Sequence, residues 1–155
     1  MLVAPSDPDS PDARLLLVEL DAALRAITGD SGASSFDARD VRGPRALFLV
    51  ARARGGALLG CGALRPLDGE EDGDTAELKR MYARPGSGAG KLLLAALEAQ
   101  ALALGYREVR LSTRRVNLRA LDFYRRHGYA ETAAWGKYIG NAASVCLGRA
   151  LVSGT

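Results

Sequence analysis

The spacing of the hydrophobic residues predicts a helix near the N-terminus. Leu16, Leu20 and Leu24 recur at intervals that place them on one helical face. Ser10-Pro11, just before them, is typical of an N-cap followed by proline in the first turn. Gly29 is expected to end this helix, and the glycine-containing stretch 29–44 then has the character of a loop.

Short apolar runs farther along the chain predict strands. Residues 46–53 and 57–67 form two such runs separated by a pair of glycines, a pattern that predicts a hairpin. The acidic loop 68–74 leads to a third strand, expected over 75–83. Residues 1–11 are expected to form either a first strand or a loose N-terminus.

The second half of the chain alternates between helices and strands. The expected elements are a helix over about 91–104, a strand over 106–113, a helix over 117–128, and closing strands within YAETAAW and SVCLGRALV. Leu118, Leu121 and either Tyr124 or Phe123 are expected to face the core. A strand–helix–strand unit over 75–113 places one parallel pair in a mainly antiparallel sheet. The order predicts a mixed α/β (α+β) fold in a single domain over 1–155.

Composition limits the classes of protein to consider. The 155 residues suffice for one domain with a core, and 48% of them are hydrophobic, which is ordinary for a soluble protein. No apolar run reaches the roughly 18 residues of a membrane span. The N-terminus lacks the features of a signal peptide, so a cytoplasmic protein without a membrane partner is expected. Cys61 and Cys146 are expected to be reduced core residues, and with His127 the only histidine, no metal site is expected.

Five small residues, Gly86-Ser87-Gly88-Ala89-Gly90, stand directly before the apolar helix. The start of a helix presents unpaired N–H groups and the positive end of its dipole, and glycines let ligand oxygens approach closely. The pattern therefore fits a phosphate site, although by itself a flexible glycine turn fits it about as well. A Walker A loop is excluded because Pro85 replaces its glycine and Leu92 its serine or threonine.

The charge of the chain is mild overall but uneven along the sequence. The net charge is 21 − 18 = +3, and seven arginines lie between Arg107 and Arg126. A basic face can meet nucleic acid or the phosphates of a small ligand, whereas for each single arginine a solvated helix face is the simpler interpretation. The chain lacks the clustered aromatic residues that stack on bases, so no nucleic-acid partner is expected.

Four segments in fixed order resemble the GNAT family, the GCN5-related N-acetyltransferases. They are ELKRMYARP (77–85), the glycine loop, KLLLAALEAQALALGY (91–106) and NLRALDFYRRHGY (117–129). The last segment carries Asn117, Ala120, Phe123-Tyr124 and Gly128-Tyr129 at the family's spacing. The resemblance covers roughly residues 12–152. It implies the GNAT fold, a central, mostly antiparallel sheet of six to seven strands with one splayed parallel pair, flanked by helices.

The resemblance also implies an acetyl-CoA-dependent N-acetyltransferase that acts on a primary amine of an unidentified small molecule or peptide. The pyrophosphate of coenzyme A would lie on the backbone amides of Gly86, Ser87, Gly88, Ala89, Gly90 and Lys91. The pantetheine arm would run beside the backbone of Met81, Tyr82 and Ala83, and Asn117 would contact it or cap its own helix. No metal is implied, and family members often form homodimers.

Two residues are candidates for the chemistry. Tyr124 matches the family's tyrosine general acid, since a phenol near pKa 10 can protonate a departing thiolate. Glu77 is the candidate base, because some members use a glutamate on this strand; an ion pair with Lys79 or an arginine is an equally good interpretation. Trp135 and Tyr138 lie in a segment that often lines the acceptor pocket, with aromatic packing as the alternative.

Pro85 departs from the family pattern. It occupies the place of an arginine and has no N–H to donate, so the loop has one donor and one charge fewer. An acyl-CoA-binding module with little or no turnover therefore stands as the alternative to an enzyme.

Overall fold

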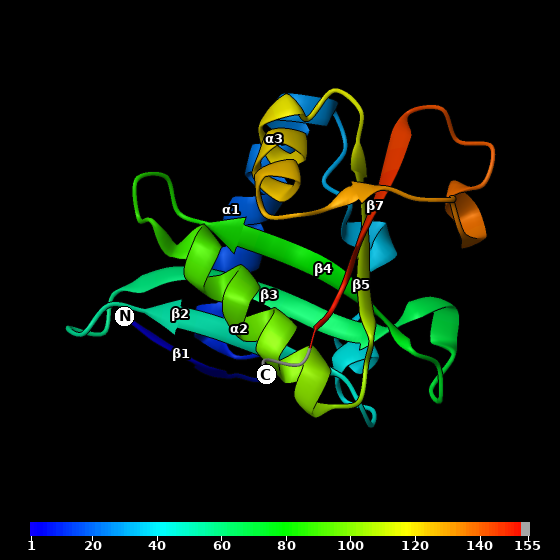
Figure 1. The fold of residues 1–155 in the computed structure, drawn as a ribbon. Coiled ribbons are helices and arrows are strands. Elements are labelled where there is room, and N and C mark those ends of the chain that lie inside the picture. The colour runs from blue at the N-terminus through cyan, green and yellow to red at the C-terminus, as the bar shows by residue number, and fades with distance from the viewer. Residues whose placement is uncertain (153–155) are drawn as a thin grey trace.

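The computed structural model describes residues 1–152, in which helices lie on both faces of a seven-stranded sheet (Figure 1). The strands are β1 (Leu2–Pro5), β2 (Leu47–Arg52), β3 (Leu58–Pro66), β4 (Thr75–Ala83), β5 (Glu108–Arg114), β6 (Ala130–Glu131) and β7 (Ser144–Ala150). The helices are α1 (Pro11–Thr28), α2 (Ala89–Ala103) and α3 (Leu118–Arg126). The strand order is β1-β2-β3-β4-β5-β7-β6, and only β4 and β5 are parallel neighbours. The predicted mixed fold with one parallel pair is confirmed.

The ends of α1 follow the signals in the sequence. The Ser10 side chain accepts a hydrogen bond from the amide of Ala13, and Pro11 occupies the first turn. Gly29 ends the helix in the left-handed conformation with φ of 79°, which glycine adopts without steric cost. The helix is thus placed over the sheet by local interactions at both ends.

Alternation along the central strands divides the core between the two faces. Phe48 and Val50 of β2 pack with Leu16 of α1 on one face. On the other face, Leu49 packs in a larger cluster with residues of α2 and α3, among them Leu94, Leu97, Leu121 and Tyr124. Figure 1 shows α2 in front of β2, β3 and β4, with α1 behind them. Both sides of the central strands are therefore covered.

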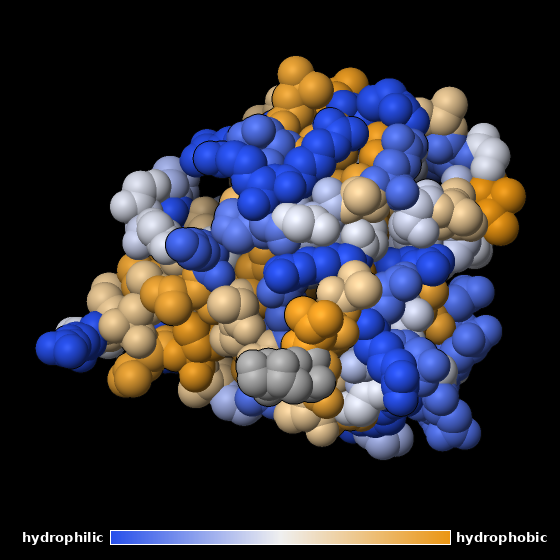
Figure 2. All heavy atoms as spheres, viewed as in Figure 1, coloured by the Kyte–Doolittle hydropathy of each residue, from blue (hydrophilic) through white to orange (hydrophobic). Residues whose placement is uncertain are grey.

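The surface view shows how polarity is distributed over one face. Hydrophilic residues dominate the part of Figure 2 around α3, whereas apolar residues gather toward the N-terminal half of α2. Leu92, in the first turns of α2, is 49% exposed.

Several boundaries differ from those expected. The residues 1–11 contain the strand β1, which is one of the two alternatives expected there, whereas α2 begins at Ala89 rather than about Lys91. The closing strand β6 is limited to Ala130–Glu131. Leu118 is 73% exposed, so its predicted core position is wrong; it is the first helical residue of α3, and the buried face begins at Leu121.

Candidate active site

The parallel pair opens into a cleft. β4 and β5 are in register only from Thr75 opposite Glu108 to Glu77 opposite Arg110, although both strands continue beyond these residues. The amide of Arg84 donates to the carbonyl of Leu59 on the β3 side, at 2.7 Å. Because successive residues of a strand direct their backbone groups to opposite sides, those of Ala83 and Met81 face the opening toward β5. They are free to bind an extended ligand.

A bulge in β4 shapes the same region. Lys79 pairs with Ala63 and Tyr82 with Cys61, so two residues of β4 stand opposite one residue of β3. Arg80 in the bulge has φ of 53°, an uncommon value for a residue other than glycine. Its guanidinium binds the Asp21 carboxylate on α1 and the carbonyl of Ser31, and these contacts hold the strained conformation in place.

The cleft is a cavity of about 310 Å³ between the two strands. Its walls come from α1 and the loop after it, from β4 and β5, from α3, and from the segment 137–144. Asn117, Ala120 and Tyr124 form the wall contributed by α3 and its cap. The structure thus brings both Tyr124 and Asn117 beside the free edge of β4.

Tyr124 lies in the wall of this cavity and is 8% exposed. Its hydroxyl has no hydrogen-bond partner among the described residues, and no unpartnered polar side-chain atom there is sealed from solvent. The hydroxyl therefore opens into the cavity. Burial raises the pKa of Tyr124 well above its ordinary value, so the phenol keeps its proton at neutral pH.

Asn117 has a structural role in the same wall. Its side-chain oxygen accepts a hydrogen bond from the amide of Ala120 at 3.2 Å, which caps α3. The capping interpretation is present in the structure, and a contact with a pantetheine arm stays a prediction.

The glycine loop adopts a compact turn before α2. The amide of Ser87 donates to the carbonyl of Arg84 at 3.0 Å, and Gly86 at the third position has φ of 75°. With Pro85 at the second position, this is the pattern of a type II turn. Pro85 therefore shapes a tight bend where the family pattern has an arginine.

Backbone donors are exposed around this turn. Gly88 is the N-cap of α2 with φ of 70°, and a Cβ built on Gly86 or Gly88 would meet no atom within 4 Å. Within residues 1–152, the amides of Gly86, Gly88, Gly90 and Lys91 have no recorded acceptor, whereas Ala89 donates to the Ser87 hydroxyl at 3.2 Å. These free N–H groups at a helix N-terminus fit the phosphates of a nucleotide-like ligand.

Gly90 serves a different purpose. A Cβ at this position would lie 3.2 Å from the Phe123 ring, closer than an ordinary contact, so glycine eases the close approach of α2 to α3. The loop and the Tyr124 helix are thereby packed side by side.

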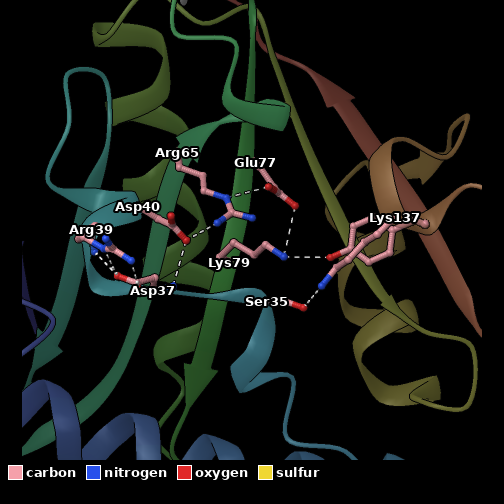
Figure 3. A network of polar contacts seen from close by, with 9 residues as sticks. Ser35, Asp37, Arg39, Asp40, Arg65, Glu77, Lys79 and Lys137 are labelled. Carbon is pink, nitrogen blue, oxygen red and sulfur yellow. Dashed lines mark hydrogen bonds and ion pairs between the residues drawn. The ribbon is translucent and has the colours of Figure 1, made fainter.

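Glu77 lies at the end of the paired part of β4 and is 2% exposed. Its carboxylate accepts from Arg65 at 2.9 Å and contacts the Lys79 ammonium at 3.3 Å (Figure 3). Arg65 also contacts Asp40. The ion-paired interpretation of Glu77 is therefore present in the structure, and a role as base stays a prediction.

The ion pairs of Glu77 connect two neighbouring cavities. Glu77 lines a neighbouring space of about 740 Å³, not the one that contains Tyr124. The Lys79 ammonium also donates to the Tyr138 hydroxyl at 2.9 Å, and Lys79 and Tyr138 line the first cavity. This link between β4 and the segment after β6 was not predicted, because nothing in the spacing of the two residues brings them together.

Other candidates lie elsewhere. The His127 ring forms a hydrogen bond with the carbonyl of Phe123 at the end of α3. Trp135 is 9% exposed and packs edge-on against Tyr138, with ring centroids 5.4 Å apart. Cys61 and Cys146 are buried free thiols, as predicted. Among residues 1–152 no histidine, cysteine or carboxylate cluster suits a metal, and no helix is long and apolar enough to cross a bilayer.

The chain matches the model of the acetyltransferase (GNAT) family over residues 17–129, which include the cleft strands, the glycine loop and Tyr124. The protein belongs to the GNAT family. A relative described as an IAA acetyltransferase from Azospirillum brasilense is 32% identical over 126 residues, or 79% of this chain and 80% of that protein. The predicted family and GNAT fold are thus confirmed.

Solved GNAT structures agree with this assignment. A proposed acyl-CoA N-acyltransferase from Klebsiella pneumoniae subsp. pneumoniae superposes with a TM-score of 0.77 at 27% identity, covering 97% of each chain. A GNAT acetyltransferase from Elizabethkingia anophelis, solved with acetyl-CoA bound, has a TM-score of 0.69 at 17% identity and also covers 97% of each chain. At that identity the second likeness shows the fold alone.

Proposed function

We propose that this GNAT protein transfers the acetyl group of acetyl-CoA to a primary amine of a small molecule or peptide. The observation that carries the proposal is the splayed cleft, where the free edge of β4 and Tyr124 line one cavity, while the glycine turn leads into α2, which packs against the Tyr124 helix at Gly90. The bound acetyl-CoA of the Elizabethkingia anophelis structure supports this choice of co-substrate.

The cofactor-binding residues divide into two groups. Of the six amides expected to hold the pyrophosphate at the start of α2, those of Gly86, Gly88, Gly90 and Lys91 are free to do so, whereas those of Ser87 and Ala89 already donate within the turn. The backbone groups of Met81 and Ala83 would hold the pantetheine arm, with Asn117 near its end, whereas those of Tyr82, also expected there, face β3. The two groups suit the two ends of coenzyme A. Exposed N–H donors of the turn can bind the anionic oxygens of the pyrophosphate, and the unpaired edge of β4 can bind the amide groups of the pantetheine arm.

Transfer then needs a neutral amine and a proton for the leaving group. The amine nitrogen attacks the thioester carbonyl, and a free amide of β4 can stabilise the oxyanion of the tetrahedral intermediate. The carbon–sulfur bond breaks, and Tyr124 gives its phenolic proton to the thiolate. Glu77 is the candidate base for the amine, although both its oxygens already contact cations.

An amine panel tests the proposal directly. Purified protein with acetyl-CoA is given each amine in turn, and release of free coenzyme A thiol is followed with a thiol reagent. Thiol release that depends on an amine supports the enzyme. Tight acetyl-CoA binding without thiol release for any amine would favour the acyl-CoA-binding module. This alternative is motivated by Pro85, which removes one N–H donor and one charge from the loop.

The same assay tests the base assignment. A general base contributes about 10²–10⁴-fold, so a loss of that size in Glu77→Gln supports the role. A smaller loss leaves Glu77 as the ionic partner of Arg65 and Lys79.

A further inference from the structure

Two hydroxyl groups in the wall of the Tyr124 cavity, those of Ser35 and Tyr138, can still donate a hydrogen bond to a ligand, because each accepts one from a lysine ammonium group. Lys79 Nζ lies 2.9 Å from the Tyr138 hydroxyl oxygen, and Lys137 Nζ contacts the Ser35 hydroxyl oxygen. An ammonium can only donate, so both hydroxyls act as acceptors in these pairs. Their own hydrogens then remain available, and Ser35, Lys137 and Tyr138 all line the cavity.

Lys137 also lacks the close carboxylate partner that the other cations of this cavity have. Three other cations line the cavity, and each has a carboxylate partner: Arg80 with Asp21, Lys79 with Glu77, and Arg114 with Asp30. Lys137 has no carboxylate within 4.0 Å among the described residues. Asp30 is the one carboxylate among the described residues that line the cavity. An anionic ligand would give the Lys137 ammonium a close partner.

These donors are held on a short, anchored segment. Lys137 and Tyr138 belong to the 3₁₀ turn Gly136–Tyr138, and the ammonium groups of Lys79 and Lys137 each lie 5.5 Å from the centre of the Tyr138 ring. Figure 3 shows Lys137 reaching across to Ser35, which lies in the loop after α1. A carboxylate placed here would accept from an ammonium and two hydroxyls, which are strong, directional interactions.

We propose that the acetyl acceptor is a small amine that also carries a carboxylate, of the amino-acid class, and that Ser35, Lys137 and Tyr138 bind this carboxylate. The inference rests on the proposed function. Tyr124 lines the same cavity, so the amine can react near its hydroxyl while the carboxylate is held by the 3₁₀ turn. The volume of about 310 Å³ suits a free amino acid, and the positive charge of Lys137 disfavours polycationic acceptors.

The first experiment compares matched acceptors. Each amino acid is assayed beside its carboxamide, which has the same size without the charge, and beside the amine that lacks the carboxylate. We expect kcat/KM to favour the amino acid by about tenfold or more, as a charge-assisted hydrogen bond allows. The carboxamide's amine is the less basic one and is more deprotonated at neutral pH, so this difference works against the expected preference.

The second experiment tests the residues. Lys137→Gln is expected to raise KM for the amino acid about tenfold with little change in kcat, since the carboxylate does not react. KM for the carboxamide and for acetyl-CoA should stay unchanged, and Lys137→Arg should keep the preference. Tyr138→Phe should raise the same KM. Arg54→Gln, an exposed arginine in the β2–β3 turn outside the cavity, is the control for the loss of one charge and should behave like wild type.

The outcomes separate this inference from the proposed function. Equal or better use of amines without a carboxylate, including polyamines, would overturn the inference and leave acetyl transfer standing. An unchanged preference in Lys137→Gln would overturn the assignment of the site. A peptide used far better than any free amino acid would overturn the small-acceptor class. No acetylation of any amine would instead contradict the proposed function itself.

Discussion

At the scale of single residues, the chemistry depends on Tyr124 keeping a proton that it can give away. Its hydroxyl opens into the cavity without a protein partner, and burial raises the pKa of the phenol. The phenol is therefore protonated at neutral pH. Tyr129 is a useful contrast, because its ring lies 5.6 Å from that of Tyr124 while its hydroxyl donates to Glu98 at 2.8 Å.

We expect Tyr124→Phe to lower kcat by about 100-fold or more while changing the dissociation constant for acetyl-CoA by less than about threefold, since only the acid is removed. Steady-state kinetics and calorimetric binding measure the two quantities. In the control, Tyr129→Phe, the lost hydrogen bond should cost about 1 kcal/mol of stability and leave kcat near wild type. Similar losses in the two variants would argue against Tyr124 as the acid.

Other residues show why sequence alone could not define the site. The position of Tyr124 follows from local spacing within α3, whereas the partners of Glu77 come from β3 and from its own strand, and those of Tyr138 and Lys137 come from β4 and the loop after α1. Contacts between residues 59 or 102 positions apart leave no periodic signal in a single sequence. The carboxylate site therefore became visible only with side chains in place.

At the scale of elements, the strands and helices were predictable because each is bounded by local signals. β4 spans Thr75–Ala83 as predicted, and Ser10 and Gly29 bound α1. Boundaries failed where no side chain caps the element, as at the start of α2, where Gly88 provides no side-chain cap. The same lack of a side chain at Gly88 leaves amides of this turn accessible to a ligand.

Valine substitutions test whether the missing side chain at Gly88 matters for ligand binding. Gly88 and Gly56 both have positive φ, of 70° and 94°, and at both a Cβ would meet nothing within 4 Å. Gly88→Val and Gly56→Val should each cost about 1–3 kcal/mol of stability through the left-handed conformation. Only Gly88→Val, which lies among the free amides of the turn, should weaken acetyl-CoA binding, by about tenfold or more.

Calorimetry of the two folded variants, after each is checked by thermal unfolding, distinguishes these effects. Equal affinity in both variants would mean that the phosphates bind elsewhere than on the glycine turn.

At the scale of the whole molecule, buried acidic groups should make stability fall at alkaline pH. Burial raises the pKa of the Cys61 thiol from 9.0 to about 12, and it also raises the pKa values of Tyr124 and Tyr129 above their ordinary value of 10.0. A group whose pKa is higher in the folded state stabilises the protein below its unfolded pKa and loses that contribution as pH rises toward the folded value. The first loss should therefore begin near pH 9, with the thiol, and the phenols should add to it above about pH 10.

Urea unfolding at pH 7, 9, 9.5 and 10, with a reducing agent present, measures this dependence. Between pH 9 and 10 the free energy of unfolding should fall with a slope approaching about 1.4 kcal/mol per pH unit, because the unfolded thiol ionises while the buried one does not. Cys61→Ala lowers stability at every pH by emptying space against α1, so the slope and not the absolute value is the readout. In that variant the fall between pH 9 and 10 should be clearly shallower, because only the onset of phenol ionisation in the unfolded chain remains. An equal slope in both proteins would show that the thiol between α1 and the sheet is not the group that limits stability in alkali.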